Sequence, residues 1–211
     1  MTKGVAGVIL AGGRATRMGG QDKGLLPLSS DVCLLDEVIA RLSPQVDAMA
    51  INANGDPDRF SGFGLTVLHD NITGFVGPLA GVLAALDWAA DQGFESVVSV
   101  AADTPFFPRN LVSKLADCSG PSGLAIAASY DEQGKLWRQP TFGLWPVSLR
   151  DDLRGALTQE GLRKIVIWTD RHSAGQAEFD ANPDGTDPFF NVNTPEDLET
   201  AQSIYSAQEP R

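Results

Sequence analysis

Short apolar runs and helix-spaced apolar repeats alternate along the first half of the chain. Mostly apolar runs at residues 5–10, 46–51, 65–69 and 96–102 are typical of strands buried in a sheet. Between them, leucine, valine and isoleucine recur at helical spacing over residues 34–42 and again over residues 79–86. This alternation predicts an α/β fold, with helices flanking a mostly parallel central sheet.

Residues that favour helix ends support these helices. Asp31 is placed to cap the amino end of the first helix, and Pro44 lies beyond its other end. Gly93 follows the second helix, where a glycine commonly ends one. Near the end of the chain, Thr194 and Pro195 followed by two acidic residues predict the first turn of a further helix.

The second half of the chain is less regular. Residues 124–130 and 136–145 flank an Asp-Glu-Gln-Gly turn, which predicts a β-hairpin excursion. Residues 162–169 fit a helix or a strand equally well. No internal repeat and no low-complexity linker divides the sequence, so we expect a single domain over residues 1–211.

Charge and composition exclude several function classes. The 211 residues hold 27 acidic and 16 basic side chains, a net charge of −11 that would repel the phosphate backbone of a nucleic acid. Glycines and a proline interrupt the longest uncharged stretch, residues 72–86, so we expect no membrane span. Cys33 and Cys118 have neither metal-ligand nor redox spacing, and two reduced thiols predict a cytoplasmic protein.

The loop at residues 11–24, after the first predicted strand, concentrates positive charge in this acidic chain. It contains five glycines together with Arg14, Arg17 and Lys23. Glycines let backbone N–H groups turn inward around phosphate oxygens, and the cations supply matching charge. The loop matches neither a Walker A sequence nor the dinucleotide-binding glycine pattern. We interpret it as a phosphate-binding loop; the alternative is a flexible solvated turn.

Several motifs in this loop and beyond it resemble one family. Leu10-Ala11-Gly12-Gly13, Arg17-Met18-Gly19 and Asp22-Lys23-Gly24 resemble the signature loop of nucleotidyltransferases, and more narrowly of the molybdenum cofactor guanylyltransferases (MobA-like). Similar segments follow in the family's order at residues 77–81, 103–105 and 191–197. The resemblance implies one Rossmann-like nucleotidyltransferase domain, with nucleotide binding in its amino-terminal half and acceptor binding in its carboxyl-terminal half.

The resemblance also implies roles for individual residues. Lys23, Arg17 and Asp103 would be catalytic. The positions implied to bind GTP are Leu10, Ala11, Gly12, Gly13, Lys23, Asn52, Asp70, Gly77, Pro78, Leu79 and Asp103. From the residues alone, Asp70 could accept hydrogen bonds from guanine or from ribose, or could simply be a turn residue.

Two further groups of residues complete the expected site. Asp103 follows a buried strand, where a carboxylate can hold Mg²⁺, and the resemblance implies Asn193 as a second ligand. Both residues could instead be turn or cap residues. Asn191, Arg138 and Thr141 are candidates for binding the acceptor, although an exposed hairpin without such a role is an open alternative.

The function implied is transfer of GMP from MgGTP to the terminal phosphate of Mo-molybdopterin, with release of pyrophosphate. Such a phosphate is ionised at neutral pH, so no general base is required, and His69 and His172 have no partners typical of a hydrolase triad. The alternatives are a cytidylyl- or sugar-phosphate nucleotidyltransferase, or a non-enzymatic nucleotide-binding module. We expect a monomer whose protein partners would include molybdopterin-synthesis and molybdoenzyme maturation proteins.

Overall fold

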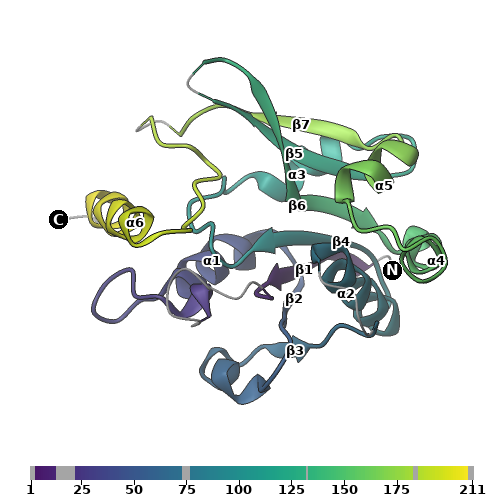
Figure 1. The fold of residues 1–211 in the computed structure, drawn as a ribbon, viewed down its shortest axis with the longest axis horizontal. Helices are drawn as coiled ribbons and strands as arrows, with labels where there is room; N and C mark the ends of the chain where they lie inside the picture. The colour runs from purple at the N-terminus through teal and green to yellow at the C-terminus, as the bar shows by residue number, and fades with distance from the viewer. Residues whose placement is uncertain (1–2, 13–21, 73–76, 132, 183–184, 209–211) are drawn as a thin grey trace.

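The computed structural model describes residues 3–12, 22–72, 77–131, 133–182 and 185–208, which form an α/β fold around one sheet (Figure 1). The strand order is β3-β2-β1-β4-β6-β5-β7, and β6 alone runs antiparallel to its neighbours within this described part. The predicted fold class is confirmed. The strands are β1 (Lys3–Leu10), β2 (Ala48–Asn52), β3 (Thr66–Leu68), β4 (Phe94–Ala101), β5 (Ala125–Tyr130), β6 (Leu136–Pro146) and β7 (Gly175–Phe179).

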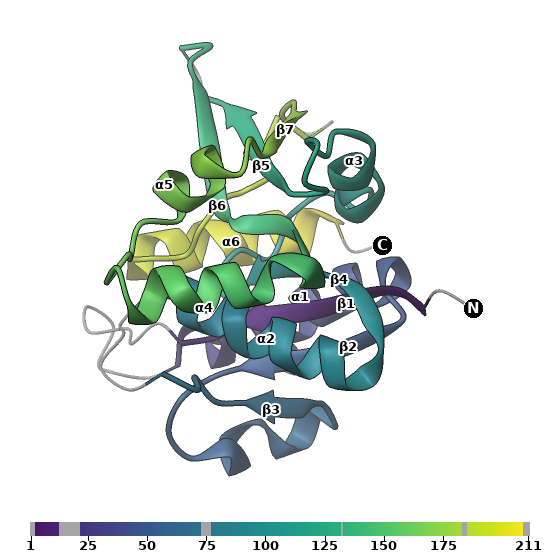
Figure 2. The same ribbon diagram turned by 90° about the vertical axis from the view of Figure 1, so that its right-hand side faces the viewer.

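Helices cover both faces of this sheet. The α-helices are α1 (Leu34–Leu42), α2 (Pro78–Gln92), α3 (Leu111–Asp117), α4 (Arg150–Thr158), α5 (Ile165–Arg171) and α6 (Pro195–Gln208). Short 3-10 turns are η2 (Lys23–Leu25), η3 (Ser43–Gln45), η4 (Pro57–Phe63) and η5 (Val147–Leu149). Apolar residues of α2, α4 and α5 share a cluster on one face, whereas those of α1 and α3 share a cluster on the other (Figures 1 and 2).

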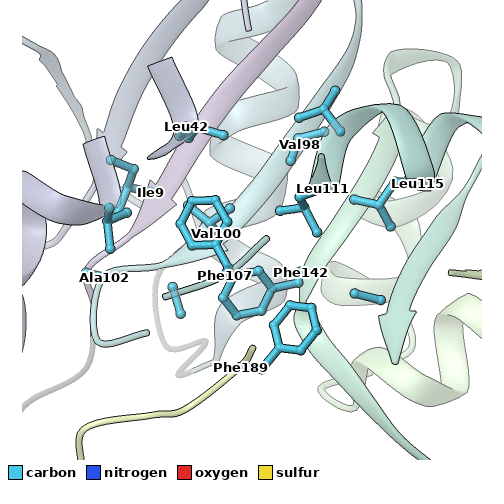
Figure 3. Packing of buried hydrophobic residues seen from close by; sticks show 14 of the residues in the cluster. Ile9, Leu42, Val98, Val100, Ala102, Phe107, Leu111, Leu115, Phe142 and Phe189 are labelled. Carbon is cyan, nitrogen blue, oxygen red and sulfur yellow. The ribbon is translucent and has the colours of Figure 1, made fainter. Parts of the chain in front are cut away.

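The central strands are apolar on both faces because each face is covered. In β1, Val8 and Ile9 are both fully buried, but they belong to the clusters on opposite faces, as the alternation of side chains along a strand requires. Figure 3 shows Ile9 and Val100 in the cluster on the α1 and α3 face, together with Phe142 and Phe189. The rings of these two phenylalanines meet edge to face, with centroids 4.8 Å apart.

The start of α1 differs from the prediction. Cys33, not Asp31, is the amino-terminal cap, and its backbone N–H donates to Asp36 Oδ2 at 2.8 Å. A bridge between Pro27 and Cys33 closes the preceding segment into a turn, which leaves Asp31 exposed and two residues too early to cap the helix. Burial raises the pKa of the Cys33 thiol to about 11, which fits an unreactive structural cysteine.

The other helix ends agree with the sequence. Gly93 ends α2 in the left-handed conformation, with φ of 77°, and its N–H bonds to the last turn. Thr194 caps α6, accepting a hydrogen bond from the N–H of Asp197 at 3.2 Å. The ambiguous segment at residues 162–169 contributes the start of α5, so its helical spacing prevails over its strand-like composition.

The predicted hairpin is formed by β5 and β6, and its tip stands out from the body of the molecule in Figure 2. Its base is part of the main sheet, because β6 also pairs with β4. No described helix is long and apolar enough to cross a membrane.

The strand register positions the site. Leu10 is level with Asn52 on one side and with Ala101 on the other, while Asn52 is level with Leu68. The carboxyl ends of β1, β2, β3 and β4 therefore lie along one edge of the sheet, where ligands bind in folds of this kind.

Candidate active site

Three side chains that are far apart in the sequence meet at this edge. Lys23 Nζ donates hydrogen bonds to Asp103 Oδ2 at 3.0 Å and to Asn193 Oδ1 at 2.5 Å. The side chains of Lys23 and Asp103 are 17% and 20% exposed, so the ion pair is partly shielded yet open to a ligand. We call Lys23, Asp103 and Asn193 the lysine cluster.

Each member of the lysine cluster is held by its own element. Lys23 opens the η2 turn, and the adjacent Gly24 lies so close to Ala102 that a Cβ on Gly24 would be 3.2 Å from the alanine Cβ. Asp103 follows β4, and its carbonyl accepts the N–H of Val192 at 2.8 Å. This backbone bond fixes the segment that carries Asn193 beside Asp103.

The first turn of α6 completes the support. Asp197 Oδ2 accepts the backbone N–H groups of Asn193 and Thr194 at 2.8 and 2.9 Å. The bond from Asn193 is the largest cause that lowers the pKa of Asp197, and the positive charge of Lys23 contributes a smaller part. Asp197 therefore stays ionised near neutral pH and keeps Asn193 in place.

A second polar group lies at the ends of β2 and β3. Asn52 Nδ2 donates to Asp70 Oδ1 at 3.0 Å, and Asn54 Nδ2 donates to Asp70 Oδ2 at 2.8 Å. Asn54 Oδ1 in turn accepts the N–H of Asp70 at 3.0 Å. The carboxylate of Asp70 is thus held from both sides. Asn54 was not predicted as a site residue, because an asparagine in a loop carries no periodic signal.

The start of α2 lies against this second group. A Cβ on Gly81 would be 2.1 Å from Asn52 Oδ1, so only a glycine lets the first turn approach Asn52 this closely. Gly77 is the cap and Pro78 the first residue of α2, as Pro at this position favours. The side chain of Leu79 is buried in the core, so only its backbone could meet a ligand.

The first loop is described only in part. Leu10 ends β1, and the backbone N–H of Ala11 donates to the carbonyl of Asn52 at 2.8 Å. Among the described residues, no atom lies within 4 Å of a Cβ built on Gly12. The predicted roles of Gly13 and Arg17 fall on residues outside the described ranges.

The predicted acceptor residues are not gathered into the lysine cluster. Arg138 contacts Asp170 on α5 and Gln176 on β7, and its side chain is 41% exposed. The carbonyl of Thr141 accepts the Ser99 hydroxyl at 2.7 Å, which is a contact within the sheet. Asn191 is exposed and lies two residues from Asn193.

The lysine cluster also contains oxygen ligands that suit a divalent cation. The ammonium group of Lys23 lies between Asp103 Oδ2 and Asn193 Oδ1. Both oxygens therefore face a position at which they stabilise a positive charge. The described residues include no group of three or more His, Cys, Asp and Glu side chains placed to hold a metal. One carboxylate and one amide fit Mg²⁺, which takes few protein ligands and completes its shell with phosphate and water oxygens.

Comparison with known proteins gives the site its context. The sequence profile of the MobA-like NTP transferase domain matches residues 7–174. The chain belongs to this family. The predicted resemblance is thereby confirmed. Lys23 and Asp103 lie within the matched residues, whereas Asn193 lies beyond them.

Curated members of the MobA-like family match nearly the whole chain. A molybdenum cofactor guanylyltransferase of Mesorhizobium japonicum is 46% identical over 208 residues, covering 97% of each chain. Another, from Bradyrhizobium sp., is 46% identical over 212 residues, covering 99% of this chain and 96% of its own.

Solved structures agree on the fold. Molybdopterin-guanine dinucleotide biosynthesis protein A from Archaeoglobus fulgidus superposes with a TM-score of 0.70 at 24% identity, covering 97% of this chain and 100% of its own. A putative glucose-1-phosphate thymidylyltransferase from Bacillus anthracis gives a TM-score of 0.72 at 14% identity, covering 98% and 97%. The same architecture therefore serves different nucleotides, so it does not by itself select the substrate.

Proposed function

We propose that this chain transfers GMP from MgGTP to the terminal phosphate of Mo-molybdopterin and releases pyrophosphate. The observation that carries the proposal is the lysine cluster, which combines a cation and two oxygen ligands at the edge of the sheet. Curated relatives at 46% identity over nearly the whole length are named for this reaction, which supports the choice of substrates.

The chemistry needs charge neutralisation more than proton transfer. An oxygen of the acceptor phosphate forms a bond to the α-phosphorus of GTP, and the bond to the β-phosphate oxygen breaks with its electron pair. The acceptor is already an anion, so the obstacle is repulsion among negative oxygens. Lys23 supplies a positive charge where that repulsion is greatest, and we assign Arg17 and the backbone of Gly12 and Gly13 to the same triphosphate.

Asp103 and Asn193 would hold Mg²⁺ through one oxygen each, as the bridging ammonium of Lys23 suggests. When bound, the metal ion would screen the charge of the phosphate oxygens that it contacts. Lys23 remains the residue that we assign to the phosphates themselves.

The guanosine part is assigned to the ends of β2 and β3. Asp70 is fixed by Asn52 and Asn54, and a carboxylate fixed in this way can accept N1–H and N2–H of guanine without a large ordering cost. The close approach of Gly81 to Asn52 leaves α2 next to the same place, so the backbone of Gly77, Pro78 and Leu79 is part of the proposed nucleotide site.

The acceptor is assigned to the carboxyl-terminal half, with Asn191, Arg138 and Thr141 as proposed contacts. Asn191 is the best supported of the three, because it is exposed and adjoins the segment that carries Asn193. Contact with proteins that make molybdopterin or mature molybdoenzymes, a monomeric state and a cytoplasmic location also remain predictions.

Two measurements test the proposal. In the presence of Mg²⁺, GTP should raise the midpoint of thermal unfolding more than CTP or UTP at equal concentration. Pyrophosphate should be released from GTP only when Mo-molybdopterin is added. Preferential protection by CTP would assign a cytidylyl transferase, and binding of GTP without pyrophosphate release would assign a nucleotide-binding module.

A further inference from the structure

Arg59 lies on the η4 turn, which connects β2 to β3, and contacts residues on both sides of the site. Its Nη2 donates to the carbonyl of Asn54 at 2.7 Å, and its Nη1 donates to the carbonyl of Asp56 at 2.8 Å. Its Nε lies 2.6 Å from Asp22 Oδ2 in an ion pair. One guanidinium therefore spans from the β2–β3 connection to the residue before Lys23.

The surroundings of Arg59 hold the guanidinium in one position. The side chains of Arg59 and Asp22 are each 25% exposed, and the guanidinium lies over the ring of Phe60 at 4.7 Å from its centroid. Phe60 is itself fully buried in the core. Gly55, with φ of 91°, approaches so closely that a Cβ would be 3.0 Å from Arg59 Nη1. An arginine held on three sides can transmit a constraint between its partners.

Both partners of Arg59 adjoin residues with assigned roles. Asn54, whose carbonyl Arg59 binds, uses its side chain to clamp Asp70 through two hydrogen bonds. Asp22, the ionic partner, directly precedes Lys23. We propose that Arg59 is a positioning residue that couples recognition of the guanine base at Asp70 to the placement of Lys23 over the triphosphate. This inference rests on the proposed function.

The ion pair with Asp22 distinguishes a coupling role for Arg59 from a role that only stabilises its own turn. The bonds to Asn54 and Asp56 alone would only stabilise the turn that carries Arg59. The ion pair with Asp22 adds nothing to that turn. Instead, it holds the residue before Lys23 against the side of the site assigned to the base. If Arg59 works through Asp22, losing either residue should produce the same defect.

The coupling predicts a particular kinetic defect in Arg59→Gln. Loss of charged hydrogen bonds of this kind should lower kcat/KM for GTP by roughly tenfold. The preference for GTP over inosine triphosphate, which lacks the 2-amino group, should fall several-fold, because Asp70 is then less firmly held. Arg59→Lys should not restore either quantity, since an ammonium cannot bind two carbonyls and a carboxylate in the same fork.

The experiment compares wild type, Arg59→Gln, Asp22→Asn and the double variant by acceptor-dependent pyrophosphate release from GTP and inosine triphosphate. Arg154→Gln is the matched control, because it breaks an arginine–carboxylate pair, with Asp87, that joins α2 to α4. We expect the double variant to lose no more than Arg59→Gln and the control to keep the wild-type nucleotide preference. Losses that multiply in the double variant would overturn the coupling. The coupling would also be overturned if Arg59→Gln were only less stable than wild type and kept the wild-type preference for GTP over inosine triphosphate.

Failure of the proposed function would look different. If wild type releases no pyrophosphate, calorimetric titration with MgGTP and with Mg-tripolyphosphate still tests the coupling. Arg59→Gln should then lose the extra affinity that the guanosine part gives over tripolyphosphate. Equal gains from guanosine in wild type and variant would refute the inference.

Discussion

Replacing Lys23 with alanine tests the lysine cluster most severely. The change removes one ammonium that lies 3.0 Å from Asp103 Oδ2 and 2.5 Å from Asn193 Oδ1. It leaves both oxygens close together, with no described cation between them. The change adds no bulk and disturbs no buried apolar side chain, so its effects should be electrostatic.

The expected effects on stability and on turnover differ in size. The ion pair with Asp103 is partly exposed, and pairs of this kind contribute about 0–1 kcal/mol to folding. In the reaction, by contrast, loss of a donor aimed at developing charge raises the barrier by about 3 kcal/mol, or roughly a hundredfold in rate. Lys23→Ala should therefore be a folded protein with very low turnover.

The assay is acceptor-dependent pyrophosphate release, measured beside the midpoint of thermal unfolding. Lys114→Ala is the matched control, because Lys114 on α3 lies over the ring of Phe179 and contacts no member of the lysine cluster. The control should lose up to about 1 kcal/mol of stability and keep its turnover. Wild-type turnover in Lys23→Ala, or equal losses of turnover in both variants, would refute the role of Lys23.

Three further predictions concern the rest of the site. Asp103→Asn should lower activity at least a hundredfold and raise the magnesium concentration at which pyrophosphate release is half-maximal. Full activity of this variant at low magnesium would contradict a metal-binding role for Asp103. Gly81→Ala should destabilise the fold by about 1–3 kcal/mol and weaken GTP binding, because its Cβ would lie 2.1 Å from Asn52 Oδ1. Gly155→Ala is the control and should not destabilise, because outside its own helix backbone no described atom lies within 4 Å of the added Cβ. Denaturant unfolding and GTP titration check both. The lowered pKa of Asp197 means that its stabilisation is present above the usual carboxyl pKa and disappears as the pH falls through the lowered value. Asp197→Asn should therefore lose about 1 kcal/mol at pH 7 and progressively less as the pH is lowered in a series of urea melts. A loss that does not shrink as the pH falls would contradict this.

The members of the lysine cluster were predicted from their places beside recognisable elements and, for Asn193, from the family resemblance. Lys23 lies in a glycine-rich loop after the first strand, Asp103 follows a buried strand, and Asn193 precedes a well-marked helix cap. Parallel strands bring their carboxyl ends to one edge, so residues far apart in the chain converge without any contact being known in advance. The hydrogen bonds from Lys23 show that these three residues come together in the folded chain; their roles remain proposals.

Residues whose importance depends on packing could not be predicted. Arg59 and Asn54 lie in a polar connection without periodicity, and only the folded chain shows that they link Asp22 with Asp70. The expected cap at Asp31 was wrong for a related reason. The bridge that delays the helix to Cys33 is a tertiary contact, and local helix-capping preferences do not include it.

The most direct test of the account is to incubate the protein with MgGTP and Mo-molybdopterin and to determine the mass of the pterin product. The account predicts a product heavier by one GMP, formed together with one equivalent of pyrophosphate, and formed roughly a hundredfold more slowly by Lys23→Ala. A pterin of unchanged mass in the presence of bound GTP, or an adduct formed from CTP in preference to GTP, would contradict it.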